Sequence, residues 1–405
     1  MTSITGSEAW LTAYREAAED LPNVVAAAKP VLCFSNACID VIVRLTVLEE
    51  AVATSGMQEA VEFFDALKAK AQQGVGGEVR WESENLPGWL AAHPQNKRAI
   101  GGTGPQAAWA LSEIGAPSLT ALADRSAGFL DSLPKGIMIA QGEEMVAGYS
   151  IAPTTAPRPE IFIFEFSRGD ILGGQPLPRS SRIIVRFNDP GLERDDDFVS
   201  LSPHFAANTV ALAGGLGSVG VDRIGVELDY LGVLSQAWRD NGLRLLHLEL
   251  GGYTDKAALA AVLEASGRVG HSLGMSASEF PDVAFGNAPT PEAMLSRARE
   301  LGLTRLCVHA DDWTASVTLG DPETERRALI YGSLLAASRA NAGGPVSDIR
   351  VPQDAEFSDP AFQDANMDDG WSYVSVATPH LTNPAATLGL GDTFSAGCLL
   401  SLSLG

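Results

Sequence analysis

The stretch NPAATLGLGDTFSAG, residues 383–397, decides how the rest of the chain is interpreted. Glycines stand directly before an acidic residue, which is followed by small residues that favour a helix. The N–H groups of Gly389, Leu390 and Gly391 would lie at the amino terminus of that helix, where hydrogen bonding and the helix dipole both favour an anion. Asp392 would lie beside a bound phosphate, where a carboxylate suits a general base for a hydroxyl that attacks phosphorus. The alternative for Asp392 is a helix cap.

Outward from this stretch, short apolar runs alternate with Ala- and Leu-rich stretches of helical length. Several runs are apolar almost throughout, which is typical of strands that are buried on both faces. Many of the helical stretches end on Gly, as helices commonly do. The alternation predicts an α/β fold with a central, mostly parallel sheet flanked by helices. The candidate strands are residues 30–36, 145–151, 160–166, 182–187, 209–214, 243–250, 304–310 and 371–377.

Two regions, residues 42–98 and 140–190, break this alternation. The first is polar and turn-rich around GVGGEVRWESENLPGW, and the second holds closely spaced candidate strands without a helix between them. We therefore expect these two regions to form a smaller, β-rich lid domain inserted in a large domain. The large domain would comprise residues 1–41, 99–139 and 191–405.

Charge and composition exclude several classes of protein. The 405 residues include 28 Lys and Arg against 50 Asp and Glu, and this net charge of −22 opposes binding to nucleic acid or to an anionic membrane. No run reaches the roughly 18 apolar residues of a membrane span, and the amino terminus is typical of an acidic amphipathic helix rather than a secretory signal. We therefore expect a cytoplasmic protein. The four cysteines form no CxxC pair, which favours free thiols.

Six segments, in order along the chain, resemble the motifs of one family. GLGDTFSAG (389–397) resembles the anion-hole motif of the ribokinase superfamily, and NPAATLGLGDT is most similar to its ADP-dependent glucokinase and phosphofructokinase branch. The resemblance implies a ribokinase-like large domain, a lid domain and a Mg²⁺-dependent kinase that acts on a sugar hydroxyl. The other matching segments are CFSNACID (33–40), AIGGTGPQAAWAL (99–111), EIFIFEFSRGD (160–170), HLELGG (247–252) and LGMSASEF (273–280).

The resemblance assigns sugar contacts to Asn36 and Asp40, whereas Cys38 stands where the family motif has a second Asn. An amide and a carboxylate together donate and accept hydrogen bonds with sugar hydroxyls, although turn capping is an equal alternative for Asn36. Glu78 lies in a segment that resembles the lid stretch in which ADP-dependent glucokinases carry a Glu against a neutral sugar. A carboxylate there repels a phosphorylated sugar. The alternative is an exposed Glu on a strand.

Two further motifs carry candidate site residues. Gly101 and Gly102 match the family's Gly-Gly segment, and Thr103 stands at a position often held by Gln. Arg168 follows the suspected lid strand, and closure of such a lid would bring its guanidinium to a phosphate and exclude water. The alternative is an exposed Arg in a turn.

Glu249 and Glu279 are the candidate Mg²⁺ residues. Each follows a strand-like run, and the carboxyl ends of parallel strands meet at the edge where such folds bind ligands. Mg²⁺ needs only one or two carboxylates beside phosphate oxygens and water. Ser276 replaces the Asn of the family's N-x-x-E motif. A surface ion pair for Glu249 and a charge at a helix amino terminus for Glu279 are the alternatives.

Three residues are assigned to the nucleotide. His247 would lie on the same strand face as Glu249, where it orients that carboxylate or contacts phosphate, and a buried core histidine is the alternative. His309 resembles a family His at the end of another strand, and Asn383 begins the anion-hole segment.

These residues together predict a kinase that transfers a phosphoryl group from ADP to a sugar or sugar-like alcohol. One alternative keeps the fold but uses ATP or a modified sugar or cyclitol, since Cys38, Thr103 and Ser276 each replace a side-chain amide. Another is a binding protein that has lost turnover. The expected partners are a nucleotide and a small polyol, and the resemblance favours a monomer.

Overall fold

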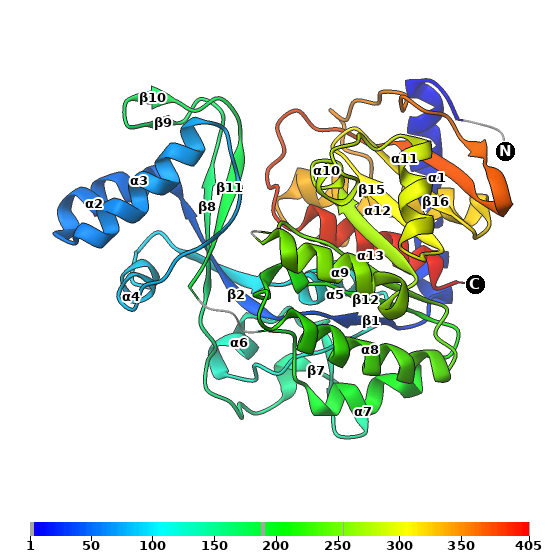
Figure 1. Ribbon diagram of the computed structural model, residues 1–405, viewed down its shortest axis with the longest axis horizontal. Coiled ribbons are helices and arrows are strands. Elements are labelled where there is room, and N and C mark those ends of the chain that lie inside the picture. Colours follow the sequence, from blue (N-terminus) through cyan, green and yellow to red (C-terminus); the bar gives the residue numbers. More distant parts are fainter. Residues whose placement is uncertain (1–3, 188–190, 254, 405) are drawn as a thin grey trace.

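The computed structural model describes residues 4–187, 191–253 and 255–404. These residues form a large sheet in the order β17-β18-β16-β15-β14-β13-β12-β1-β5-β6-β7 (Figure 1). Every pairing from β6 to β15 is parallel, and the outer pairings are antiparallel. The strands are β1 (Val31–Phe34), β5 (Ser118–Thr120), β6 (Met138–Gln141), β7 (Glu144–Ala147), β12 (Val210–Ala213), β13 (Leu245–Glu249), β14 (Ser272–Ser276), β15 (Arg305–His309), β16 (Trp313–Thr318), β17 (Ala365–Asn366) and β18 (Ser372–Ala377).

Helices cover both faces of the large sheet, because its central strands are apolar on both sides. In β1, Leu32 and Phe34 join one core cluster, whereas Val31 and Cys33 join the cluster on the opposite face. This alternation is the period of two that a strand imposes. The first face carries α7 (Asp196–Phe205), α8 (Ile224–Asp240), α9 (Lys256–Val269) and α11 (Pro291–Glu300). The other carries α1 (Ser7–Ala27), α5 (Thr103–Glu113), α6 (Ala127–Ser132), α12 (Pro322–Ala342) and α13 (Leu390–Leu402). The expected fold class is confirmed.

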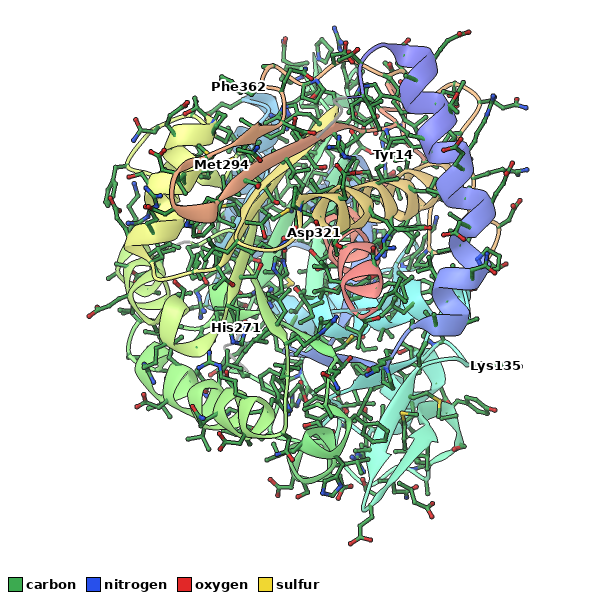
Figure 2. All side chains as sticks on the ribbon, turned by 90° about the vertical axis from the view of Figure 1, so that its right-hand side faces the viewer. Tyr14, Lys135, His271, Met294, Asp321 and Phe362 are labelled. Carbon is green, nitrogen blue, oxygen red and sulfur yellow. The ribbon has the colours of Figure 1, made fainter. Side chains whose placement is uncertain are left out.

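Helix α1 closes the side of the molecule that faces the viewer in Figure 2. Tyr14 lies on its inward side, is fully buried and donates a hydrogen bond to the Ala377 carbonyl. Within the described residues, no helix combines the length and the apolar character that crossing a bilayer requires. The four cysteines are free and buried.

A second, small sheet stands beside the large one in the order β3-β11-β8-β2-β4 (Figure 1). Phe63 and Phe64 of α3 pack with Phe162 and Phe164 of β8 to form its core, and α2 and α3 lie on the side away from the large sheet. The strands are β2 (Cys38–Arg44), β3 (Gly77–Arg80), β4 (Lys97–Gly101), β8 (Ile161–Phe166) and β11 (Ser181–Arg186). The helices are α2 (Leu48–Ser55), α3 (Gln58–Gln72) and α4 (Leu86–Ala91), and β9 (Ile171–Leu172) pairs with β10 (Gln175–Pro176).

The strand pairing differs from three of the expected lid boundaries, at residues 42, 98 and 140. The hairpin of β6 and β7 extends the edge of the large sheet, so residues 140–147 do not belong to the small sheet. Strand β2 joins the small sheet from Cys38, and β4 remains in it to Gly101. A strand pattern indicates that a segment is extended but not which sheet it joins, because hydrogen-bonded partners lie far away in the sequence.

Candidate active site

The glycine-rich stretch before α13 has the geometry expected of an anion-binding loop. Gly389 is the residue before the first helical turn and has φ 71°, a left-handed conformation that favours glycine. A Cβ at Gly389 would collide with the Arg339 guanidinium, and a Cβ at Gly391 would lie 3.3 Å from His309 Cε1. The N–H groups of Gly389, Leu390 and Gly391 therefore lie at a helix amino terminus. The two glycines there pack tightly against Arg339 and His309.

Asp392 lies in the first turn of α13 and is not the helix cap. The cap position is occupied by Gly389, which has no side chain that could cap the helix. Burial raises the pKa of Asp392, and the positive charges of Arg339 and Arg182 and a hydrogen bond with Thr103 counteract that shift. The structure therefore places a partly desolvated carboxylate beside the anion-binding loop.

Arg339 of α12 lies beneath this loop and escaped the sequence analysis. It is buried, and it donates from Nη1 to Thr393 Oγ1 (2.9 Å) and from Nη2 to Gln106 Oε1 (2.6 Å). Burial lowers its pKa to about 10, so the guanidinium still carries its charge at neutral pH. The one sequence signal was a lone Arg in the apolar helical stretch LLAASRANA.

We expect Arg339→Met to weaken the binding of a phosphate-bearing ligand at this loop by about tenfold, because it removes a fixed positive charge and two hydrogen bonds from beneath the loop. Isothermal titration of each variant with ADP measures this change. The matched control is Arg297→Met on α11, where Arg297 pairs with Glu300 instead. Equal ADP affinity in both variants would remove Arg339 from the site.

Arg182, and not Arg168, is the small-sheet arginine that reaches the anion-binding loop. Its Nη1 lies 3.4 Å from Thr387 Oγ1, and its charge acts on Asp392 and Asp40. Arg168 is exposed in the turn after β8, where its backbone N–H donates to Ser180 Oγ. The antiparallel pairing of β11 with β8 decides which side chain leaves the sheet toward α13. The expectation for Arg168 depends on closure of the lid and stays a prediction.

A cavity of about 600 Å³ lies next to this loop. Its walls come from the small sheet, from the ends of β14 and β15, from α12 and from residues 378–391. Arg179, Arg182, His309 and His380 line it, together with Ala336 and Ala337. Asn383 is exposed and is not among its lining residues, although Thr382 and Pro384 are. The cavity is thus lined by two arginines and by small residues, which suits a phosphate-bearing ligand.

Glu249 is a buried acceptor at the carboxyl end of β13. Its Oε1 accepts from His309 Nε2 (3.0 Å), and its Oε2 accepts from His247 Nε2 (3.0 Å) and Ser395 Oγ (2.9 Å). Burial opposes the charged form, but these donors outweigh it and lower the pKa of Glu249 to about 2. Glu249 is thus a fixed anion that ties α13 to the ends of two strands.

The two histidines hold Glu249 in place. His247 Nδ1 lies 2.7 Å from Ser272 Oγ, and burial lowers the pKa of His247. Burial also opposes charge on His309, but the hydrogen bond and charge of Glu249 outweigh it and raise its pKa. His309 lines the cavity, whereas His247 is 3% exposed and orients Glu249 from below.

Glu279 and Glu249 fit a hydrated Mg²⁺ better than a directly ligated one. Both oxygens of Glu249 already accept hydrogen bonds, and Glu279 Oε2 accepts from the Ser276 N–H (2.8 Å). Burial raises the pKa of Glu279, and the charge of Glu249 adds to that shift. Across the described residues, no three His, Cys, Asp or Glu side chains form a metal cage. Mg²⁺ retains several waters, which suits these two acids.

The expected sugar contacts lie together between the two sheets. Asn36 is buried and donates from Nδ2 to Ser218 Oγ (2.8 Å). A Cβ at Gly101 would collide with the Asp40 carboxylate, and Gly102 has φ 93° and lies against the Asn36 carbonyl. Only glycine fits at these two positions, because a side chain would collide with the Asp40 carboxylate or with the Asn36 carbonyl.

Asp40 and Thr103 link this group to Asp392. Cys38 Sγ donates to Asp40 Oδ1 (3.4 Å). The residue that replaces the second Asn of the family motif therefore contacts a carboxylate of the expected sugar site. The charge of Asp392 raises the pKa of Asp40, and the Thr103 side chain lowers the pKa of Asp392. The acceptor and anion groups therefore form one continuous site.

Glu78 is paired rather than free. Its Oε2 accepts from Arg186 Nε (3.0 Å) on the neighbouring strand β11, and its Cγ is near Gly252 after β13. The charge of Arg186 also acts on Asp40. The sequence analysis missed Arg186, since the parallel pairing of β3 with β11 that brings it to Glu78 has no local signal.

A mostly parallel sheet with a glycine-rich helix terminus at its carboxyl edge, and a small sheet beside that edge, gives the chain the α/β fold of an ADP-dependent kinase. The model of the ADP-specific phosphofructokinase/glucokinase conserved region matches residues 29–286. The chain belongs to this family.

Solved structures agree with the fold. An ADP-dependent kinase in complex with fructose-6-phosphate and ADPβS has a TM-score of 0.79 and 18% identity, over 99% of each chain. A hypothetical ADP-dependent phosphofructokinase from Pyrococcus horikoshii OT3 has a TM-score of 0.74 and 18% identity, over 94% of this chain and 98% of that one. The last common ancestor of the Methanosarcinales ADP-dependent phosphofructokinases has a TM-score of 0.72 and 18% identity, over 98% of each. No curated protein sequence matches the chain significantly.

Proposed function

We propose that this protein transfers the terminal phosphoryl group of ADP to a sugar hydroxyl, with Asp392 as general base. The observation that carries the proposal is that Asp392 lies in the first turn of α13, directly after the glycine-rich loop, and that its charge acts on Asp40 of the expected sugar site. The acceptor oxygen bonds to phosphorus as the bond to the bridging oxygen of ADP breaks, AMP leaves, and the hydroxyl proton passes to Asp392.

The remaining groups have complementary roles. The N–H groups of Gly389, Leu390 and Gly391 hold the transferring phosphate, and Arg182 offsets its charge from the small sheet. Mg²⁺, when bound near Glu249 and Glu279, offsets charge on the phosphates of the donor. The small sheet acts as the lid that excludes water, which suppresses hydrolysis of the donor.

Two acceptor classes follow from the pair formed by Glu78 and Arg186. Glu78 suits the hydroxyls of a neutral sugar, as in the glucokinases that its segment resembles. Arg186 suits a sugar phosphate, and the structural neighbour holds fructose-6-phosphate together with an ADP analogue. The ion pair leaves both groups within the site, so we propose glucose and fructose 6-phosphate as the first two acceptors to test.

The test is a matrix of ADP, ATP and pyrophosphate against glucose and fructose 6-phosphate, with formation of the phosphorylated sugar as the readout. We expect transfer from ADP with release of AMP. Transfer from ATP but not from ADP would support the alternative, an ATP-dependent kinase of the same fold. Nucleotide binding, seen as a rise in Tm, without transfer to any acceptor would indicate a binding protein.

The acceptor site should respond to pH near neutrality. Burial raises the pKa of Asp40 to about 7, with the Cys38 hydrogen bond and the Arg186 charge opposing the shift. Because the ionised carboxylate is the better acceptor for a hydroxyl, the KM for the sugar should fall as pH rises through about 7. Asp40→Asn should remove this dependence of the KM on pH. The same pH dependence in the variant would contradict the assignment of Asp40.

A further inference from the structure

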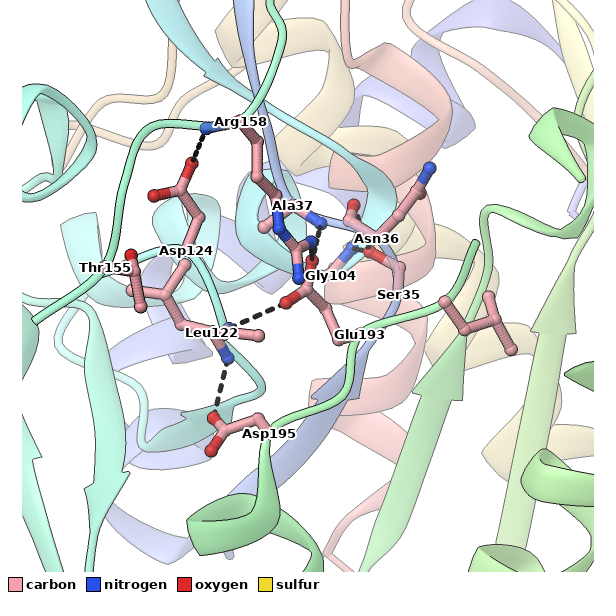
Figure 3. A network of polar contacts seen from close by, with 12 residues as sticks. Ser35, Asn36, Ala37, Gly104, Leu122, Asp124, Thr155, Arg158, Glu193 and Asp195 are labelled. Carbon is pink, nitrogen blue, oxygen red and sulfur yellow. Dashed lines mark hydrogen bonds and ion pairs between the residues drawn. The ribbon is translucent and has the colours of Figure 1, made fainter. Parts of the chain in front are cut away.

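A buried carboxylate, Glu193, joins three separate parts of the chain where they pass between the two sheets. It follows β11 and is 0% exposed. Its Oε1 accepts from the Ala37 N–H (2.7 Å) and from Arg158 Nη1 (2.7 Å), and its Oε2 accepts from the Ala123 N–H (2.7 Å) (Figure 3). Glu193 therefore holds the β1–β2 crossing, the segment after β5 and the β7–β8 crossing at one point.

The contact with Ala37 fixes a peptide unit of the acceptor site. The N–H of that unit is held by Glu193, and its carbonyl belongs to Asn36. This carbonyl accepts from Ser35 Oγ (3.1 Å) and lies against Gly102, where a Cβ would collide with it. With both ends of one peptide plane held, the plane cannot rotate without breaking a hydrogen bond or striking Gly102.

This peptide unit sets the direction of the acceptor residues on both sides of it. Asn36 precedes it and donates to Ser218, and the chain continues from it through Cys38 to Asp40. We infer that Glu193 is a positioning residue of the acceptor site, acting through the Ala37 N–H. The inference rests on the proposed function, because that function makes residues 36–40 the acceptor contacts.

Asp195 provides a matched control within the same segment. It is 4% exposed and also has three donors: the Leu122 N–H (2.9 Å), which Figure 3 shows, the Phe198 N–H (3.2 Å) and Arg125 Nη2 (3.1 Å). None of its described hydrogen bonds reaches residues 36–40. A merely structural role would therefore make Asp195 and Glu193 equivalent.

The experiment compares Glu193→Gln with Asp195→Asn in the full chain. In Glu193→Gln one carboxylate oxygen becomes an NH₂ group. In the Oε2 position it loses the Ala123 contact, and in the Oε1 position it loses the Ala37 and Arg158 contacts. Either arrangement removes the negative charge that strengthens the hydrogen bond from the Ala37 N–H. We expect amide hydrogen exchange in residues 35–41 to become about tenfold faster in Glu193→Gln and to stay at the wild-type rate in Asp195→Asn. We also expect the KM for the accepted sugar to rise by about tenfold in Glu193→Gln, with kcat and the KM for ADP within about twofold of wild type.

Equal exchange in the two variants, or an unchanged acceptor KM in Glu193→Gln, overturns the inference. If Glu193→Gln fails to fold, Glu193→Asp replaces it, since the shorter carboxylate loses reach to one N–H but keeps its charge, and the same two results are expected. If the wild-type protein phosphorylates neither glucose nor fructose 6-phosphate, the proposed function fails. The exchange comparison then decides by itself whether Glu193 holds this segment.

Discussion

Asp392→Asn is expected to lower kcat by about 10²–10⁴ and to leave the affinity for ADP at or above the wild-type value. The loss in rate follows because an amide cannot take the proton of the attacking hydroxyl. Nucleotide affinity is retained because the change removes a negative charge from beside the phosphate. Steady-state kinetics with saturating sugar, together with titration of ADP, measure the two effects.

Glu292→Gln is the control for this experiment. Glu292 is an acidic residue in the first turn of α11, so it shares with Asp392 the favourable interaction with a helix amino terminus. If Asp392 served only the helix, both variants would lose the same small stability and neither would lose rate. A wild-type kcat in Asp392→Asn would exclude it as the base.

Arg182→Gln is expected to lower kcat by about 10²–10³, which is the usual effect of removing a group that stabilises charge in the transition state. The guanidinium reaches from β11 to Thr387 beside the anion-binding loop, and its charge acts on Asp392. Gln is neutral and shorter than Arg, so it loses both the charge and the reach to Thr387. The comparison is made at saturating ADP, so that binding does not contribute.

Arg168→Gln is its matched partner, because it removes the same charge from an exposed turn of the same sheet. We expect its kcat to stay within about twofold of wild type. The opposite result, with Arg168→Gln inactive and Arg182→Gln active, would assign the role to Arg168, as the sequence motif predicts. It would contradict the assignment of Arg182 that we base on the small sheet.

Some features of this site were accessible from the sequence because their signals are local. The glycines before Asp392 determine a left-handed turn at the start of a helix within a few residues. The apolar runs that became β1, β12 and β18 are buried on both faces, and this burial is visible in their composition. Glu249 follows such a strand, so its place at the carboxyl edge was also predictable.

Other features depended on pairing between distant segments. The hairpin at 138–147 has the same extended pattern whether it joins the small sheet or the large one, and hydrogen bonding placed it in the large one. The role of His247 was left open, because only the packed structure shows its two nitrogens engaged with Ser272 and Glu249. Arg186 meets Glu78 by strand register, which no local pattern encodes.

The sequence by itself thus determined the fold class and the glycine-rich loop, since periodicity, glycine conformation and helix termini act over a few residues, and the resemblance of its motifs indicated the family. Only the tertiary structure decided which charges share the site. Arg182 is 210 residues from Asp392 along the chain (392 − 182), Arg339 lies on another helix, and Glu193 contacts Ala37 across 156 residues. Buried charges are stabilised by the partners that folding brings to them, and those partners are set by sheet register and helix packing rather than by neighbouring residues.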